Sequence, residues 1–225
     1  MPDPTLQIAT PRDSADLSLV LARGFADDPI WRWMAPADRR WPVRVAPVFR
    51  HLIGPPIGYG TTWTTTTHDG AAVWAPPGKS SFPNGAAARS VPAMVSGLGP
   101  SGLRRTLKMV ARMEKVHPKE PHWYLEFLAT DAHLRGKGIG SLLIAPALER
   151  ADDEGVGAYL ESSKLDNVPF YRRHGFEVVE EMVAVPGAPV ARPPVELGDE
   201  VGLLVEQAGA QHVGEEVVVA VPASA

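Results

Sequence analysis

The chain has 225 residues, 26 acidic and 22 basic side chains, a net charge of -4 and 44% hydrophobic residues. This size and composition suit one soluble globular domain with a full core. The slightly acidic balance gives no electrostatic reason to expect a nucleic-acid or anionic-membrane partner. The chain has no cysteine, which excludes disulfides, thiolate metal sites and a cysteine acyl-enzyme.

Residues 1–10 show no basic stretch followed by an apolar run, and no apolar run reaches the roughly 18 residues that a membrane span needs. We therefore expect a cytoplasmic protein with no membrane partner. In chain order, hydrophobic spacing predicts a strand over residues 5–9 and helices over 14–26 and 38–52. Two short strands follow over 60–67 and 71–74, joined by a hairpin turn that the Asp-Gly pair predicts.

Residues 77–120 are predicted to form a helical insertion before the central strand. Helices are expected over 86–98 and 103–116. The second helix places apolar side chains on one side and basic ones around the rest, and we expect the basic side to be a solvated face. The apolar side comprises Leu103, Leu107, Val110 and Met113.

A glycine-rich turn follows the central strand-like run 123–129. It reads Arg135-Gly136-Lys137-Gly138-Ile139-Gly140 and precedes a helix-like run over 141–151. Such glycines tolerate positive φ and let successive N–H groups face one ligand, and the unpaired N–H groups of the next helix add to an anion site. The spacing fits neither a Walker A loop nor the dinucleotide fingerprint G-x-G-x-x-G. The turn therefore predicts a phosphate site of another kind.

A second pattern lies downstream, between residues 158 and 185. Residues 158–160 form an expected strand, Asp166 or Asn167 caps a short helix with Pro169 in its first turn, and Gly175 ends that helix before a strand over 177–185.

Together the two patterns resemble the GNAT superfamily of N-acetyltransferases. Arg135, Gly138 and Gly140 fit its acetyl-CoA loop R-x-x-G-x-G, and residues 167–176 fit its second cofactor motif, N-x-P-F-Y-x-x-x-G-F. The puromycin N-acetyltransferases are the most similar group. The resemblance implies an α/β fold with a mixed, mostly antiparallel sheet of six to seven strands, split at its centre, and helices on both faces.

The resemblance also implies a domain organisation. A single N-acetyltransferase domain is expected over 1–185, followed by a divergent Pro-rich tail over 186–225. Similar enzymes add a last strand to the sheet, and here the tail offers 201–206 or 217–221 for it, both apolar and β-branched. The alternative is a partly disordered tail.

The implied activity is transfer of the acetyl group of acetyl-CoA to a primary amine of a small molecule, aminonucleoside-like or other, by direct attack in a ternary complex. The expected partner is that amine, the expected oligomeric state is a monomer or homodimer, and no metal is expected. By resemblance the acetyl-CoA site comprises Leu128, Ala129, Thr130, Arg135, Gly136, Lys137, Gly138, Ile139, Gly140, Ser141 and Asn167.

Acid–base residues are required because only about one alkylamine molecule in a thousand is unprotonated at pH 7. Glu126, a carboxylate in an apolar strand, is the candidate base; Glu161 is its rival, and a structural salt bridge is the other interpretation of either. Strand alternation groups Glu126 with Tyr124 and Leu128, opposite Trp123, Leu125 and Phe127. The resemblance implies Tyr171 as the acid that protonates the leaving thiolate.

The acceptor is weakly encoded. By resemblance, Trp31, Trp33, Tyr124 and Glu161 are expected near it, although core packing explains the tryptophans equally well. Two other functions stay open: acetylation of a protein amine, and a catalytically silent CoA-binding sensor.

Overall fold

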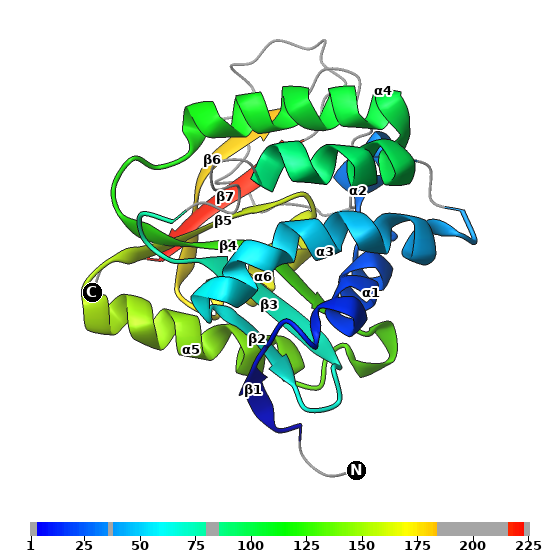
Figure 1. Cartoon of the computed structure of the whole chain (residues 1–225). Helices are drawn as coiled ribbons and strands as arrows, with labels where there is room; N and C mark the ends of the chain where they lie inside the picture. The colour runs from blue at the N-terminus through cyan, green and yellow to red at the C-terminus, as the bar shows by residue number, and fades with distance from the viewer. Residues whose placement is uncertain (1–3, 36–37, 80–85, 184–215, 223–225) are drawn as a thin grey trace.

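The structure, a computed structural model, describes residues 4–35, 38–79, 86–183 and 216–222. One seven-stranded sheet runs through it (Figure 1) in the order β1-β2-β3-β4-β5-β7-β6. Only β4 and β5 pair in parallel, so the expected mixed, mostly antiparallel sheet is confirmed. The strands are β1 (Leu6–Ile8), β2 (Thr62–Thr65), β3 (Gly70–Ala75), β4 (His122–Thr130), β5 (Gly157–Ser162), β6 (Phe176–Val183) and β7 (Glu216–Pro222).

Helices cover both faces of the sheet. Alternate residues of β3 show the two layers: Ala71 and Val73 pack into the core beneath α1, α3 and α4, whereas Ala72 and Trp74 pack into the core beneath α5. Figure 1 shows α5 apart from the other three long helices. The helices are α1 (Ser14–Gly24), α2 (Pro29–Met34), α3 (Trp41–Tyr59), α4 (Ala86–Val116), α5 (Ile139–Glu154) and α6 (Val168–Arg172), with 3-10 turns η1 (Ala132–Leu134) and η2 (Leu165–Asn167).

Two of these helices differ from the sequence prediction. The second expected helix, 38–52, instead runs from 41 to 59 and contains Pro47, Pro55 and Pro56. Its apolar side packs against α1 and α4, and this burial outweighs the hydrogen bonds that the prolines remove. The short helix α2 was not predicted. Its N-cap is Asp28, whose carboxylate accepts from the backbone N–H of Trp31 at 2.9 Å.

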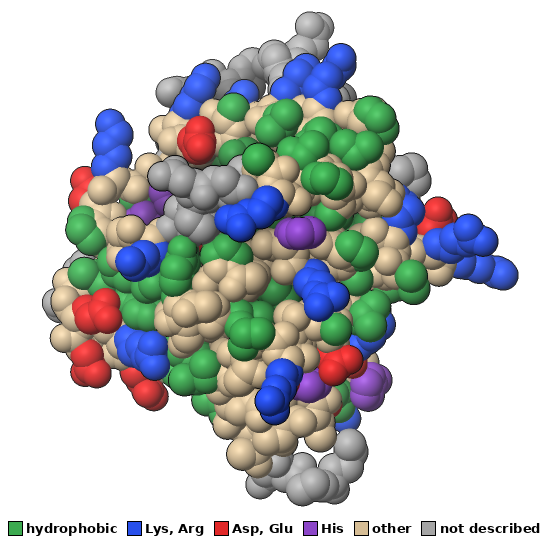
Figure 2. Space-filling model, viewed as in Figure 1, with side chains coloured by type: hydrophobic (Ala, Val, Ile, Leu, Met, Phe, Trp, Pro, Cys, Tyr) green, Lys and Arg blue, Asp and Glu red, His purple; other side chains and the backbone are tan. Residues whose placement is uncertain are grey.

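The insertion forms a bent helix. The two expected helices are joined at Gly99, which has φ 77° and breaks α4 ahead of Pro100. Leu107, expected on the apolar side, is 60% exposed, and Figure 2 shows hydrophobic side chains at the surface over α4. Val110 and Met113, also expected on that side, do line a cavity, together with Met109, which was not expected there.

The sheet divides between β4 and β5. These strands pair only from His122 to Leu125, while β4 stays paired with β3 as far as Thr130. The β3–β4 register passes from Trp74–Leu125 to Val73–Phe127, so Glu126 is the extra residue of a β-bulge. Because of the bulge, the side chains after Glu126 do not alternate as expected. Phe127 packs into the α1–α3 core and Leu128 into the α5 core.

The last strand comes from the tail. Of the two candidate segments, 217–221 lies within β7, which pairs antiparallel with both β5 and β6. The other candidate, 201–206, and most of the tail lie outside the described residues.

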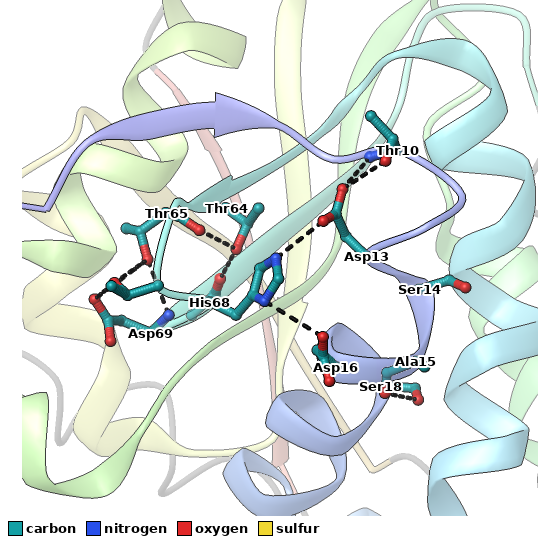
Figure 3. A network of polar contacts seen from close by, with 12 residues as sticks. Thr10, Asp13, Ser14, Ala15, Asp16, Ser18, Thr64, Thr65, His68 and Asp69 are labelled. Carbon is teal, nitrogen blue, oxygen red and sulfur yellow. Dashed lines mark hydrogen bonds and ion pairs between the residues drawn. The ribbon is translucent and has the colours of Figure 1, made fainter.

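A polar network fastens the β2–β3 turn to the start of α1 (Figure 3). His68, at φ 53°, takes the left-handed conformation in this turn. The sequence favours the Asp-Gly pair for that conformation. Its Nε2 lies 3.0 Å from Asp13 Oδ1 and its Nδ1 3.6 Å from Asp16 Oδ2. Asp13 Oδ2 also accepts from the backbone N–H and hydroxyl of Thr10, both at 2.7 Å.

We expect Asp13→Asn to lower the free energy of unfolding by about 1 kcal/mol at pH 7, because charge-assisted hydrogen bonds are lost. The bonds from Thr10, and then His68, lower the pKa of Asp13 from 3.8. The contribution of Asp13 is therefore present above pH 3.8 and disappears as the pH falls through the lower folded-state pKa. Urea unfolding over this range measures it. Asp16→Asn, at an aspartate 64% exposed, is the matched control and should change stability little.

Candidate active site

The glycine turn forms one wall of a groove of about 570 Å³. Gly138, at φ 81°, is the N-cap of α5, and no side chain caps this helix. The first N–H groups of α5 are therefore left for a ligand, and the helix dipole favours an anion there. Gly140 lies against α6, because a Cβ on it would come 3.2 Å from the Phe170 ring.

The remaining walls come from the end of β4, from α6 with the turn before it, and from the segment 24–28. Asn167 is the N-cap of α6, makes no side-chain capping bond and lines the groove. Tyr171 follows one turn later and lines the same groove. Of the predicted acetyl-CoA residues, the structure brings together Leu128, Ala129, Thr130, Arg135, Gly136, Gly138, Ile139, Gly140, Ser141 and Asn167.

Charges at the groove are partly paired. Lys164 Nζ lies 2.7 Å from Asp27 Oδ1, and Arg135 Nη1 lies 3.8 Å from Asp27 Oδ2. Burial alone would raise the pKa of Asp27, but the two cations outweigh it and the pKa is lowered. Arg135 and Lys164 both line the groove and both contact Asp27, so a phosphate bound there would meet two cations.

A second cavity, of about 180 Å³, adjoins the groove. Phe25 and Asp28 line both. The walls of the cavity are apolar side chains of α2, α3 and α4, and its polar atoms come from Asp28, Glu126, Glu161, Tyr124 and Ser163. Trp31 contributes as a wall and as core, with its ring stacked on Phe49 at 4.4 Å. The cavity therefore suits an apolar molecule with a polar or cationic end.

Glu126 and Glu161 both face this cavity. Oε1 of each is buried without a hydrogen-bond partner in the described part of the chain. Burial, and then the neighbouring Glu161, raises the pKa of Glu126 well above its usual range. A carboxylate with a raised pKa is suited to accept a proton near neutral pH.

Asp28 marks the junction of cavity and groove. Oδ1 accepts from Trp31 N–H, and Oδ2 accepts from the Ser163 hydroxyl. Burial raises the pKa of Asp28. Burial and then the nearby Asp28 also raise the pKa of Tyr171, so this phenol stays protonated and can donate a proton.

Two predicted site residues are not brought to either space. Lys137 is exposed within the turn, and Trp33 lies outside the cavity, with the Arg105 guanidinium 5.3 Å from its ring centre. Lys137 and Trp33 therefore stay predictions of the sequence, since a turn presents only some of its side chains to one space and a short helix buries only one side.

Sequence reasoning missed other residues of the site. In the sequence, Asp28 is recognisable only as the first residue of an Asp-Pro pair that starts a helix. Ser163 is recognisable only as part of the pattern between residues 158 and 185. The α4 wall carried no signal beyond an amphipathic helix, because its partners are distant in sequence. In the described ranges, no helix is long and apolar enough to cross a bilayer, and no three His, Cys, Asp or Glu side chains lie close enough together for a metal.

Comparison with known proteins identifies a family pattern in the middle of the chain. Residues 107–176 match the model of the Acetyltransferase (GNAT) family. Two curated relatives match over only 8% and 22% of their own lengths. The second, an uncharacterized N-acetyltransferase of Schizosaccharomyces pombe, is 43% identical over 54 residues, which is 24% of this chain.

Solved structures extend the similarity to the whole fold. A structure described as histone acetyltransferase HPA2 and related acetyltransferase, from Corynebacterium glutamicum, aligns over 99% of this chain and 97% of its own, with 23% identity and a TM-score of 0.63. Arylalkylamine N-acetyltransferase 2 from Aedes aegypti aligns over 99% and 100%, with 12% identity and a TM-score of 0.64. At these identities the similarity establishes the fold.

We expect Gly138→Asp to weaken acetyl-CoA binding at least tenfold, about 1.4 kcal/mol, because it strains the left-handed N-cap and adds a negative charge beside the anion site. Gly155→Asp is a matched control, since Gly155 also has positive φ and open space around it but lies at the other end of α5. Calorimetric titration with acetyl-CoA measures both. Equal weakening in the two variants would contradict the anion site.

Glu126→Gln should make the protein more stable above neutral pH, by about 1 kcal/mol or more. The raised pKa of Glu126 means that the folded protein disfavours the carboxylate, so the penalty grows as the pH rises from the usual 4.5 toward the folded-state pKa. The variant's advantage should therefore increase with pH and vanish in acid. Thermal unfolding of parent and variant between pH 5 and about pH 9 tests this, and a constant difference would contradict it.

Proposed function

We propose that this chain, which has the GNAT acetyltransferase fold, transfers the acetyl group of acetyl-CoA to a primary amine of a compact small molecule. The observation that carries the proposal is the junction at Asp28, where the glycine-turn groove opens beside an apolar cavity that contains two buried glutamates. A thioester in the groove and an amine in the cavity would meet there. Holding both reactants in one complex removes the need for a covalent enzyme intermediate.

Each step has a candidate residue. Glu126, in the acidic pair with Glu161, accepts a proton from the ammonium group and frees the amine for attack. Residues 127–130 of β4 pair with β3 but not with β5, so backbone N–H groups near Leu128 and Ala129 are candidates to bind the carbonyl oxygen. Tyr171 gives its proton to the leaving thiolate.

The size of the cavity limits which amines can be the acceptor. At about 180 Å³ it is close to the roughly 150 Å³ of a cavity that holds benzene and smaller than the 300 Å³ or more of typical drug-sized sites. An alkylamine or arylalkylamine with one ring fits this volume. Puromycin, a nucleoside joined to an aromatic amino acid, is much larger, so an aminonucleoside is a less favoured acceptor.

The two alternatives are less favoured. A protein amine would need an open groove for its peptide, and the acidic pair instead lies in a buried cavity. A silent CoA-binding sensor would not need a buried, unpartnered glutamate beside this junction, because burying such a group costs stability and catalysis is a reason to retain it.

Thiol release from acetyl-CoA tests the proposal across alkylamines, arylalkylamines, puromycin and a lysine peptide. We expect turnover with compact amines, a loss of about 100-fold in kcat for Tyr171→Phe, and at least that for Glu126→Gln. Tyr59→Phe, outside both cavities, is the control. Thermal stabilisation by acetyl-CoA without turnover would support the sensor, and preference for the peptide would support a protein acceptor.

A further inference from the structure

Acetylation of an ammonium group produces a proton that must leave the cavity. The substrate R–NH3+ loses two protons as its nitrogen forms the C–N bond and the thioester C–S bond breaks. One proton ends on the CoA sulfur, through Tyr171, and the other goes to solvent. The glutamates that receive it are buried, so the reaction needs a route outward.

A third space, of about 480 Å³, adjoins the acceptor cavity. The acceptor cavity is the apolar cavity proposed above to hold the amine. Glu161 and Tyr124 line both spaces, together with Val110 and Met113 of α4. His117, just after α4, and His122, the first residue of β4, also line this third space. The Glu161 side chain is 4% exposed and that of His117 is 34% exposed. Glu161 therefore stands between the buried cavity and a histidine that solvent reaches.

Three contacts join these groups in a row. Glu161 Oε1 lies 3.9 Å from His117 Nδ1, His117 Nε2 lies 3.1 Å from His122 Nε2, and His122 Nδ1 lies 2.7 Å from the Glu120 carbonyl oxygen. The His117 ring is held edge-on by Tyr124 and Tyr159, with ring centres 4.9 and 5.0 Å away. The first distance is an ion-pair separation that a small rotation or one water closes.

The row determines which nitrogen of His117 is free. A carbonyl oxygen only accepts, so His122 Nδ1 carries hydrogen. Burial, and then other neighbours that include His117, lower the pKa of His122, so its ring is neutral and its Nε2 accepts. His117 Nε2 must then donate, which leaves His117 Nδ1, the atom facing Glu161, able to take a proton.

We propose that Glu161 and His117 carry the proton of the amine from the acceptor cavity to solvent, and that His122 is a positioning residue that keeps Nδ1 of His117 free. This inference rests on the proposed function. Tyr124 and Glu126 of β4 also face Glu161 and interact with it electrostatically. The other titratable groups around the third space are Lys79, Glu114, Lys119, Glu120 and Tyr159.

The test compares His117→Gln with the parent on two amines of similar size, ethylamine and trifluoroethylamine. Ethylamine is protonated at pH 7 and must lose the extra proton, whereas trifluoroethylamine is largely neutral and need not. We expect kcat for ethylamine to fall about tenfold or more at pH 7, with the loss shrinking as the pH approaches about 10, and kcat for trifluoroethylamine to change little. His51→Gln, at an exposed histidine of α3, should match the parent.

Two further variants separate a relay from a structural role. His122→Leu should lower kcat for ethylamine as His117→Gln does, whereas His122→Gln, whose amide oxygen can accept from His117 Nε2–H, should keep most of the rate. Imidazole should restore activity to His117→Ala, because the third space has room for it.

Three results would overturn the relay. One is an unchanged kcat for ethylamine in His117→Gln. Another is an equal loss with both amines, which would indicate structural damage near Glu161. The third is a parent enzyme that binds acetyl-CoA but acetylates neither these amines nor any other, since that outcome refutes the proposed function itself and leaves no proton to carry.

Discussion

The parting of β4 from β5 after Leu125 is the feature on which the rest of this structure depends. A parallel pair normally continues as long as both strands do, yet beyond Leu125 β4 pairs with β3 alone, over residues 127–130. The bulge at Glu126 bends the strand at the same point. The resulting gap admits the groove, and backbone groups that a sheet would consume stay available for a ligand.

Buried acid groups are the second consequence of that gap. Asp28, Glu126 and Glu161 reach one apolar space from the start of α2, from β4 and from β5, and burial there disfavours the ionised forms of Asp28 and Glu126. The fold tolerates them because two large cores flank the sheet. The raised pKa values of Asp28 and Glu126 come from the same burial that weakens the fold, so stability and proton transfer oppose each other at these positions.

The β2–β3 turn and the helices α3 and α4 show how tertiary packing overrides local sequence signals. His68 adopts the left-handed conformation that an Asp-Gly pair would take locally, because Asp13 and Asp16 hold its ring from α1. Prolines inside α3 predict an early end, but burial of its apolar side against α1 extends it. Leu107 of α4 looks like a core position by spacing and is exposed, whereas Val110 and Met113 of the same predicted side line the cavity.

The glycine-turn half of the proposed site could be predicted from the sequence alone. Arg135 to Ser141 and Asn167 to Tyr171 are short, contiguous segments whose conformations follow from glycine, proline and helix-start chemistry, so their geometry could be predicted locally. For the acceptor half the sequence named Glu126, Glu161, Tyr124 and Trp31, but the shape of the cavity and its other residues depend on the tertiary structure. Asp28, Glu161, His117 and the α4 wall are distant in sequence, and they meet because the strand order, one extra residue at Glu126 and the bend in α4 bring them together.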